Sequence, residues 1–256
     1  MLAAWGTAVL SGSANPAEAV KAVSGDDEPH RVTAEGTALP LPGAAGLGDL
    51  LSVLGAAGAT GLRVVLPTPG DVLGLPGPPD FNADALDAGE CVLAELPSAG
   101  ETTWGLVPEV TVFGSAWEPG AMVTWRARDV RVSRVTDFGG IAEADQELRV
   151  ALTTATAELA RLDVARWRED AAERLALIRD GGIEPGLLPP TLPPRCLRVL
   201  ATAARVRAIV ELATEDDGGA VTGYEAGARS EALRGLDRVS RRAVVAAVNG
   251  ALERLT

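Results

Sequence analysis

Four charged residues have the types and positions of a ligand-binding site. Arg126 and Arg128 lie two residues apart in WRARDVRV, and in a strand this spacing places both guanidinium groups on one face, where they can bind a carboxylate or a phosphate. Asp71 and Asp80 lie in the segment 67–80, shortly after the apolar run LRVVL. Since α/β sheets bind ligands beyond the carboxyl ends of their strands, one hypothesis is a small-molecule binding protein or an enzyme with a pocket at this loop.

The composition of the segment 67–80 limits what it can bind. Each of its prolines lacks the backbone N–H group that a phosphate loop uses, and its two aspartates would repel an anion. The prolines also restrict the unfolded chain and fix the shape of the loop. A stiff connection, whose edge could touch a ligand, therefore explains the segment better than a phosphate-binding loop.

Other reactive side chains are few. The only histidine, His30, follows acidic residues at 26–28, which fits a solvated turn before a strand better than an acid–base catalyst. Cys91 and Cys196 are far apart and have no partners at metal-ligand spacing, so we expect two buried thiols and a cytoplasmic location. No nucleophile lies beside a base in the sequence, and we therefore assign no catalytic residue, no metal site and no cofactor.

A second basic pattern occurs near the carboxyl end, at helical spacing. Its members share one side of a predicted helix: Arg234, Arg238, Arg241 and Arg242. An anion or a nucleic acid is one possible partner, but the net charge of −12 argues against nucleic acid. Asp237 is positioned to pair with Arg241, so charge pairing within the protein is the simpler explanation.

The charges of the chain are divided unevenly. Residues 1–125 hold 15 acidic and 3 basic residues, whereas residues 126–256 hold 20 of each. This asymmetry predicts two units of different character. The predicted fold class is α+β, with a mixed α/β sheet domain over 1–135 and an antiparallel helical hairpin or bundle over 136–256. The alternative is one compact α+β domain whose long helices cover the sheet.

Short helices and strands are predicted in the first half. Asn15-Pro16 has the composition of a helix start, and Gly25 can end that helix. Leucines at 47, 50, 51 and 54 predict a second helix, and ADALDAG a third. Strands are predicted at HRVTA, LRVVL, ECVLAEL, WGLVPEVTVF and AMVTWRARDVRV. Pro108 interrupts the fourth of these, which predicts an edge strand or a break at that point.

Longer helices are predicted in the second half. Apolar residues recur at helical spacing from Ile141 to Ile178, and so long a helix is expected to bend near Asp163 or to protrude. A largely apolar helix is predicted from Leu197 to Thr214. Thr222 and Glu225 fit a capping box that starts a last helix, ending near Leu255.

The leading functional hypothesis is a non-catalytic interaction or scaffold protein that pairs through its long C-terminal helices with a second copy or another protein. It depends on the length of those helices and on the absence of a catalytic constellation in the sequence. No apolar run reaches the roughly 18 residues of a membrane-spanning helix, so no membrane partner is expected. The small-molecule pocket and the arginine stripe are the two alternatives.

Overall fold

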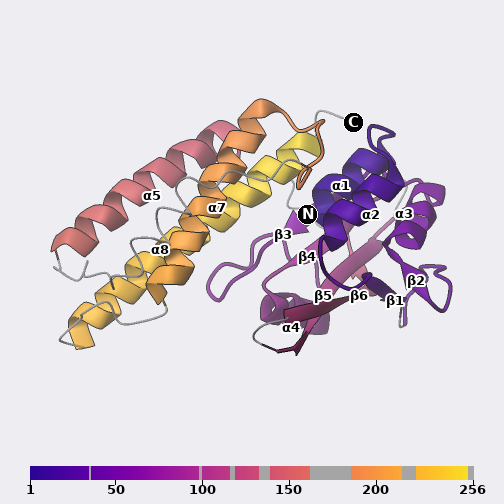
Figure 1. Ribbon diagram of the computed structural model, residues 1–256, viewed down its shortest axis with the longest axis horizontal. Coiled ribbons are helices and arrows are strands. Elements are labelled where there is room, and N and C mark those ends of the chain that lie inside the picture. The colour runs from indigo at the N-terminus through magenta and orange to yellow at the C-terminus, as the bar shows by residue number, and fades with distance from the viewer. Residues whose placement is uncertain are drawn as a thin grey trace. The chain divides into compact units, whose positions relative to one another are not determined.

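The computed structural model describes most of the chain. The described residues are 1–34, 36–97, 100–115, 119–132, 139–161, 186–214 and 223–252. They divide into two compact units (Figure 1). The sheet unit comprises Met1–Thr136, Pro185–Leu192 and Val248–Thr256, and the helical unit comprises Asp137–Glu184 and Pro193–Ala247. That residues 1–135 and 136–256 form two domains stays a prediction.

A six-stranded mixed sheet forms the centre of the sheet unit. Its strands are β1 (Arg31–Ala34), β2 (Ala45–Gly46), β3 (Gly61–Val65), β4 (Cys91–Glu95), β5 (Thr102–Gly114) and β6 (Pro119–Arg131). Their spatial order is β2-β1-β6-β5-β4-β3. β1 is parallel to β6, and the other neighbouring pairs are antiparallel. Together with the helices of the chain, this sheet confirms the predicted α+β class.

Three helices cover one face of the sheet (Figure 1). They are α1 (Leu2–Leu10), α2 (Pro16–Ser24) and α3 (Leu47–Ala56). α1 lies against β3, where Gly6 leaves no space for a Cβ atom beside the Leu62 side chain. The Thr7 hydroxyl donates to the Leu62 carbonyl and accepts from the Leu62 N–H, at 3.2 and 2.9 Å. This close approach explains why a glycine and a threonine stand in an otherwise apolar helix.

The start of α2 confirms the predicted cap. The Asn15 side chain accepts a hydrogen bond of 2.8 Å from the Ala17 N–H, and Pro16 occupies the first helical position. Gly25 follows the last helical residue with a φ of 55°, a conformation that glycine adopts without strain. Leu47, Leu50, Leu51 and Leu54 of α3 are all buried, as their spacing predicts.

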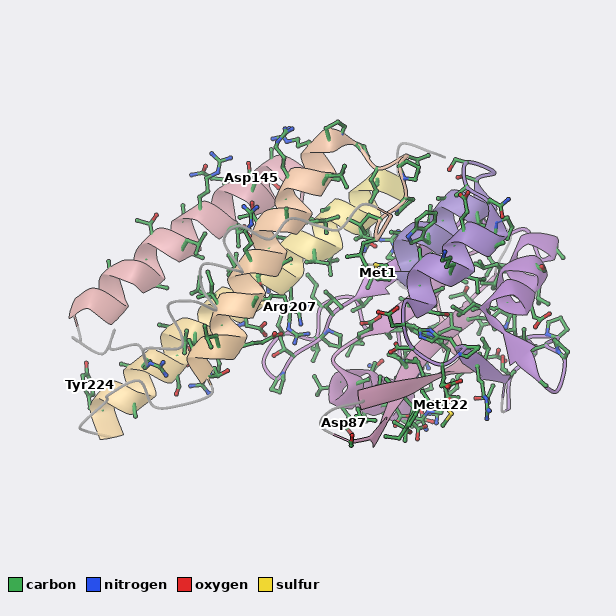
Figure 2. The ribbon with its side chains drawn as sticks, in the orientation of Figure 1. Met1, Asp87, Met122, Asp145, Arg207 and Tyr224 are labelled. Carbon is green, nitrogen blue, oxygen red and sulfur yellow. The ribbon has the colours of Figure 1, made fainter. Side chains whose placement is uncertain are left out.

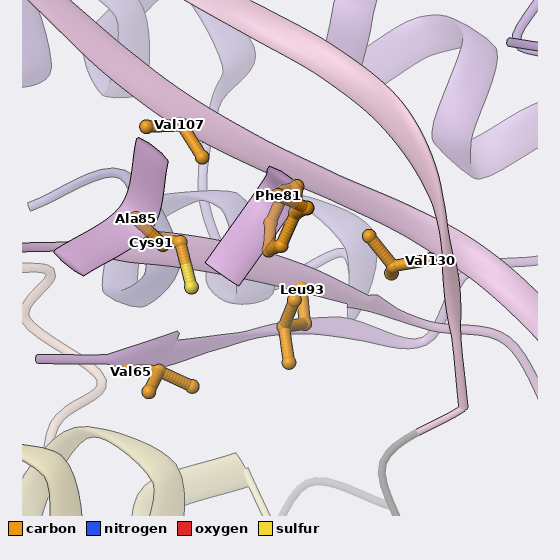
Figure 3. Packing of buried hydrophobic residues seen from close by; sticks show 7 residues of the cluster. All are labelled: Val65, Phe81, Ala85, Cys91, Leu93, Val107 and Val130. Atoms are coloured by element: carbon orange, nitrogen blue, oxygen red, sulfur yellow. The ribbon is translucent and has the colours of Figure 1, made fainter. Parts of the chain in front are cut away.

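The opposite face of the sheet packs against α4 (Pro79–Ala88). Residues alternate between the two faces of a strand, so Val65 faces α4 if Leu62 faces α1. A buried apolar cluster lies here (Figure 3): Val65, Phe81, Ala85, Cys91, Leu93, Val107 and Val130. Gly105 belongs to the same face, because a Cβ at that position would lie 2.5 Å from Phe81 Cζ and 2.9 Å from Val130 Cγ1.

Pro108 does not break β5, which runs continuously through it. It marks instead the point at which β5 becomes an edge. β4 pairs with β5 at Gly105 and Leu106, and among the described residues the segment Glu109–Gly114 has only β6 as a strand partner. The predicted edge is therefore confirmed, because proline is tolerated where one side of a strand has no neighbour.

The helical unit contains α5 (Ile141–Arg161), α7 (Pro194–Thr214) and most of α8 (Gly223–Leu252). α5 packs against α7, and Arg207 Nε of α7 lies 3.9 Å from Asp237 Oδ1 of α8. The described residues beyond Gly139 form no strand. The predicted bend near Asp163 and the predicted cap at Thr222 lie outside the described residues. No helix in the described part of the chain has the length and apolar composition needed to cross a membrane.

Candidate functional site

The two arginines predicted to bind a ligand share one face of β6 and contact α4. Arg128 lies 3.4 Å from Asp80 Oδ2 and 3.0 Å from Asp84 Oδ2. Arg126 lies 3.5 Å from Asp84 Oδ2 and, through Nε, 3.5 Å from Glu109 Oε2. Three of the predicted site residues, Asp80, Arg126 and Arg128, therefore meet in one ion-pair cluster.

This cluster connects α4 to β6. Its two guanidinium groups already have three carboxylates as partners, so an added anion would have to compete with them. The pairs are partly exposed, which limits the contribution of each to stability to less than about 1 kcal/mol. A structural role accounts for the cluster without a ligand, and ligand binding there stays a prediction.

Asp71, the fourth predicted residue, lies in a different kind of structure. Thr68 and Asp71 form a tight turn, in which the N–H of each donates to the carbonyl of the other at 2.9 and 2.8 Å. Asp71 is not among the ion-pair partners of Arg126 or Arg128. At the other end of the loop, the Asn82 side chain accepts a hydrogen bond from the Gly77 N–H, which fixes the entry into α4.

A pocket of about 480 Å³ lies on the face of the sheet that carries α1 and α2. Its apolar walls come from Leu2, Val23, Pro108, Val110 and Val123. Figure 2 labels two further lining residues, Met1 and Asp87. This volume lies within the range of small-molecule sites, about 300–1,000 Å³. Six segments of the sheet unit contribute to the pocket, so no local sequence pattern could reveal it.

His30 lines this pocket and is buried, with 7% of its surface exposed. The prediction of a solvated turn was therefore wrong for this side chain, because Trp125, 95 positions further along the chain, packs beside it. Trp125 Nε1–H donates to His30 Nδ1 at 3.2 Å. In the neutral imidazole the proton must then lie on Nε2. Nε2 has no hydrogen-bond partner among the described residues and lies 3.5 Å from Asp27 Oδ2.

Two carboxylates, Asp87 and Glu90, also line the pocket. Neither belongs to an ion pair with another described residue, and no Lys or Arg side chain lines the walls. Three strand arginines pair with acids on the face of α4 instead. Arg63 of β3 pairs with Glu95, and Arg126 and Arg128 of β6 belong to the cluster above. The pocket is therefore apolar, with acidic groups in its lining.

The outer half of the β5–β6 hairpin forms a second surface of interest, the hairpin tip, comprising Glu109–Gly114 and the β6 residues paired with them. Val110, Val112 and Phe113 are exposed to 58%, 74% and 47%. On the side away from β6, the backbone groups along this part of β5 have no neighbouring strand among the described residues. An exposed apolar edge of this kind favours pairing with another strand.

The helices of the other unit expose less apolar surface. Among the described residues of the helical unit, Val150 and Tyr224 are the large apolar side chains that are exposed. The predicted pair between Asp237 and Arg241 is present at 2.7 Å, and Arg234 pairs with Glu231. Binding of an anion by the arginine stripe stays a prediction.

The two cysteines are buried, as predicted, and form no disulfide with each other. Burial raises the pKa of the Cys91 thiol well above its usual range, and the Glu90 carboxylate raises it further. Cys91 is therefore protonated at neutral pH and is a poor nucleophile. No group of three or more potential metal ligands occurs in the described part of the chain.

Comparison with known families gives a match to both halves of the chain. Residues 1–138 match the description "Rv1486c-like protein, N-terminal domain", and residues 142–245 match "Rv1486c-like protein, C-terminal domain". A protein of Mycobacterium tuberculosis, described as "Uncharacterized protein Rv1486c", is 32% identical over 98% of this chain and 96% of its own length. The chain belongs to the Rv1486c-like family. A second relative, "Uncharacterized protein ML1804" of Mycobacterium leprae, is 30% identical over 75% of this chain and 68% of its own length.

No solved structure matches the chain. The descriptions of these Rv1486c-like relatives name no reaction, ligand or partner. What the site can do must therefore be argued from its geometry.

Proposed function

We propose that this protein is a non-catalytic interaction protein that pairs with a second copy of itself through the hairpin tip. The observation that carries the proposal is the edge of β5 that has no strand partner in the described part of the chain, along which Val110, Val112 and Phe113 are exposed. Water solvates such an edge poorly where its side chains are apolar, and a strand from another molecule satisfies both its hydrogen bonds and its apolar surface.

A second copy fits this edge by sequence. In an antiparallel pairing of Glu109–Gly114 with itself, Val110 would oppose Phe113 and Thr111 would oppose Val112. The one charged residue, Glu109, would oppose Gly114, so no like charges face each other. A twofold axis through the centre of the strand gives closed pairing that stops at two copies.

The long helices support such pairing less well. Their apolar stripes are largely buried in this chain, as at Leu148 of α5, Val199 of α7 and Leu236 of α8. The sequence predicted pairing through the helices. Val150 of α5, an exposed apolar residue, allows that surface to be tested. A catalytic role has less support, since Cys91 is protonated and the pocket holds no base in contact with a nucleophile.

The test is the association state of the full-length chain, measured by analytical ultracentrifugation. Val112→Lys places a charge on the strand edge and is expected to raise the dimer Kd at least about tenfold, or about 1.4 kcal/mol. Val72→Lys is the matched control, because Val72 is exposed to 55% in the 67–80 loop. Val150→Lys, at a residue exposed to 53%, tests the helical surface in the same way.

The outcomes separate the alternatives. Each copy carries a net charge of −12, so repulsion between copies should weaken as salt rises from about 0.05 to 0.5 M and the dimer should tighten. A chain that is monomeric at about 100 μM in the higher salt would contradict self-association. A dimer that Val150→Lys disrupts and Val112→Lys does not would return the interface to the helices.

A further inference from the structure

We propose that the pocket between α1, α2 and the sheet binds a small organic cation, in which a protonated amine is joined to an apolar group. The pocket shares Val110 with the hairpin tip, but the two proposals are tested separately, because Val112, the residue that tests the dimer, does not line the pocket. The argument rests on the chemistry of the lining, its charge and one buried hydrogen-bonding atom.

The carboxylates are the charged side chains of the lining, to which Met1 adds its terminal amino group. Asp87 and Glu90 line the pocket without a described ion-pair partner, and no Lys or Arg side chain does so. The surrounding part of the chain adds to this bias, since residues 1–125 hold 15 acidic and 3 basic residues. A cleft lined by acidic groups raises the local concentration of cations and disfavours anions.

The walls require that the ligand also have an apolar part. Trp125 provides a buried aromatic side chain, and Leu2, Val23 and Val123 provide aliphatic ones. A simple metal ion or ammonium would leave this surface unused, and no group of three or more metal ligands occurs in the described part of the chain. A volume of about 480 Å³ is sufficient for a small organic molecule.

His30 gives an independent reason to expect a ligand. Its side chain is 5% exposed and lines the pocket, and no residue that the structure describes forms a hydrogen bond with its Nε2. A buried polar atom without a partner is costly, by about 1–3 kcal/mol, and is uncommon away from functional sites. Trp125 fixes the ring by donating to Nδ1, so in the neutral imidazole Nε2–H can donate to a hydroxyl or carbonyl oxygen on the apolar part of the ligand, since a protonated amine accepts no hydrogen bond.

The experiment compares phenylethyl probes that differ in the charge of their polar group. The full-length chain is titrated with 2-phenylethylamine, 2-phenylethanol and 3-phenylpropionate, and binding is followed by saturation-transfer NMR and by the indole N–H signals. The amine is expected to bind more tightly than the alcohol, and the carboxylate not at all. Ala88→Phe, which fills the pocket from the end of α4, should abolish binding of the amine.

Charge-removing variants locate the site. Asp87→Asn and Glu90→Gln should each weaken the amine about two- to fivefold, as expected for partly exposed ion pairs, and should leave the alcohol unaffected. Glu18→Gln is the matched control, because Glu18 is an exposed residue of α2 outside the pocket. Failure of the amine to bind, equal binding of all three probes, or amine binding unaltered in the Asp87→Asn, Glu90→Gln double variant would overturn the proposal.

Discussion

Replacing Asn249 with alanine is expected to lower the free energy of unfolding of the sheet unit by about 2–4 kcal/mol. The Asn249 side chain accepts a hydrogen bond from the Val64 N–H and donates one to the Val64 carbonyl, each at 2.9 Å. Both residues are buried, and β3 is an end strand of the sheet. The amide of Asn249 thus takes the place of a neighbouring strand at Val64.

The magnitude follows from the two groups that the substitution leaves unpaired. Each buried polar group without a partner costs about 1–3 kcal/mol. Alanine regains roughly 0.5 kcal/mol, because its helix propensity exceeds that of asparagine. The free energy of unfolding should therefore fall by about 2–4 kcal/mol when the site relaxes partly. The Val64 N–H should exchange with solvent faster, by the factor that this free-energy loss corresponds to.

The measurement is urea denaturation followed by circular dichroism, together with amide hydrogen exchange at Val64. Asn82→Ala is the matched control: it removes the same side chain, which accepts a single bond from Gly77, and should cost about 1 kcal/mol. A loss below about 0.5 kcal/mol for Asn249→Ala, with unchanged exchange at Val64, would refute the role assigned to this side chain.

Three further predictions concern the face of the sheet that packs on α4. Gly105→Ala should lower the free energy of unfolding by about 1–3 kcal/mol, since the new Cβ would lie 2.5 Å from Phe81 Cζ; an unchanged denaturation midpoint would show that the ring moves freely. Burial and the nearby Glu90 raise the pKa of Cys91, so the native thiol should resist alkylation at pH 8 and react once urea unfolds the chain. Below the unfolded-state pKa of about 8.5, the folded and unfolded chains both keep the proton of Cys91, and above it only the unfolded chain loses this proton. Above that pH the free energy of unfolding should therefore fall by up to about 1.4 kcal/mol per pH unit relative to Cys91→Ala. Parallel pH profiles of stability for the two proteins would contradict this. Arg128→Met removes two ion pairs with α4 and should lower the free energy of unfolding by less than about 1 kcal/mol. This difference should shrink in high salt. A difference that does not shrink would indicate a larger role for Arg128.

Elements whose signals are local could be predicted from the sequence. The Asn15-Pro16 start of α2 and the leucine spacing of α3 each depend on a few neighbouring residues, and both were confirmed. Pro108 correctly indicated an edge, because proline restricts hydrogen bonding at its own position. In contrast, α1 was missed: an almost wholly apolar run has no helical period when a helix is buried on nearly all sides.

The candidate site was only partly predictable. The two-residue period correctly placed Arg126 and Arg128 on one face, but it could not show that acids of α4 would pair with them. His30 was misjudged because its burial depends on Trp125, on a strand distant in sequence. The carboxylates of the pocket, Asp87 and Glu90, form no recognisable sequence motif. They lie on either side of the end of α4, and only the folded chain brings them to the other lining residues.

The interaction of Asn249 with Val64 also bears on how the chain folds during synthesis. The sheet unit is discontinuous, and its last segment starts at Val248, after the whole helical unit has been made. During synthesis, α1, the six strands and α4 emerge from the ribosome well before Asn249, whose side-chain amide covers the end of the sheet. Until then the Val64 backbone is open to other strands, so misassembly should be most frequent in chains stalled late in translation.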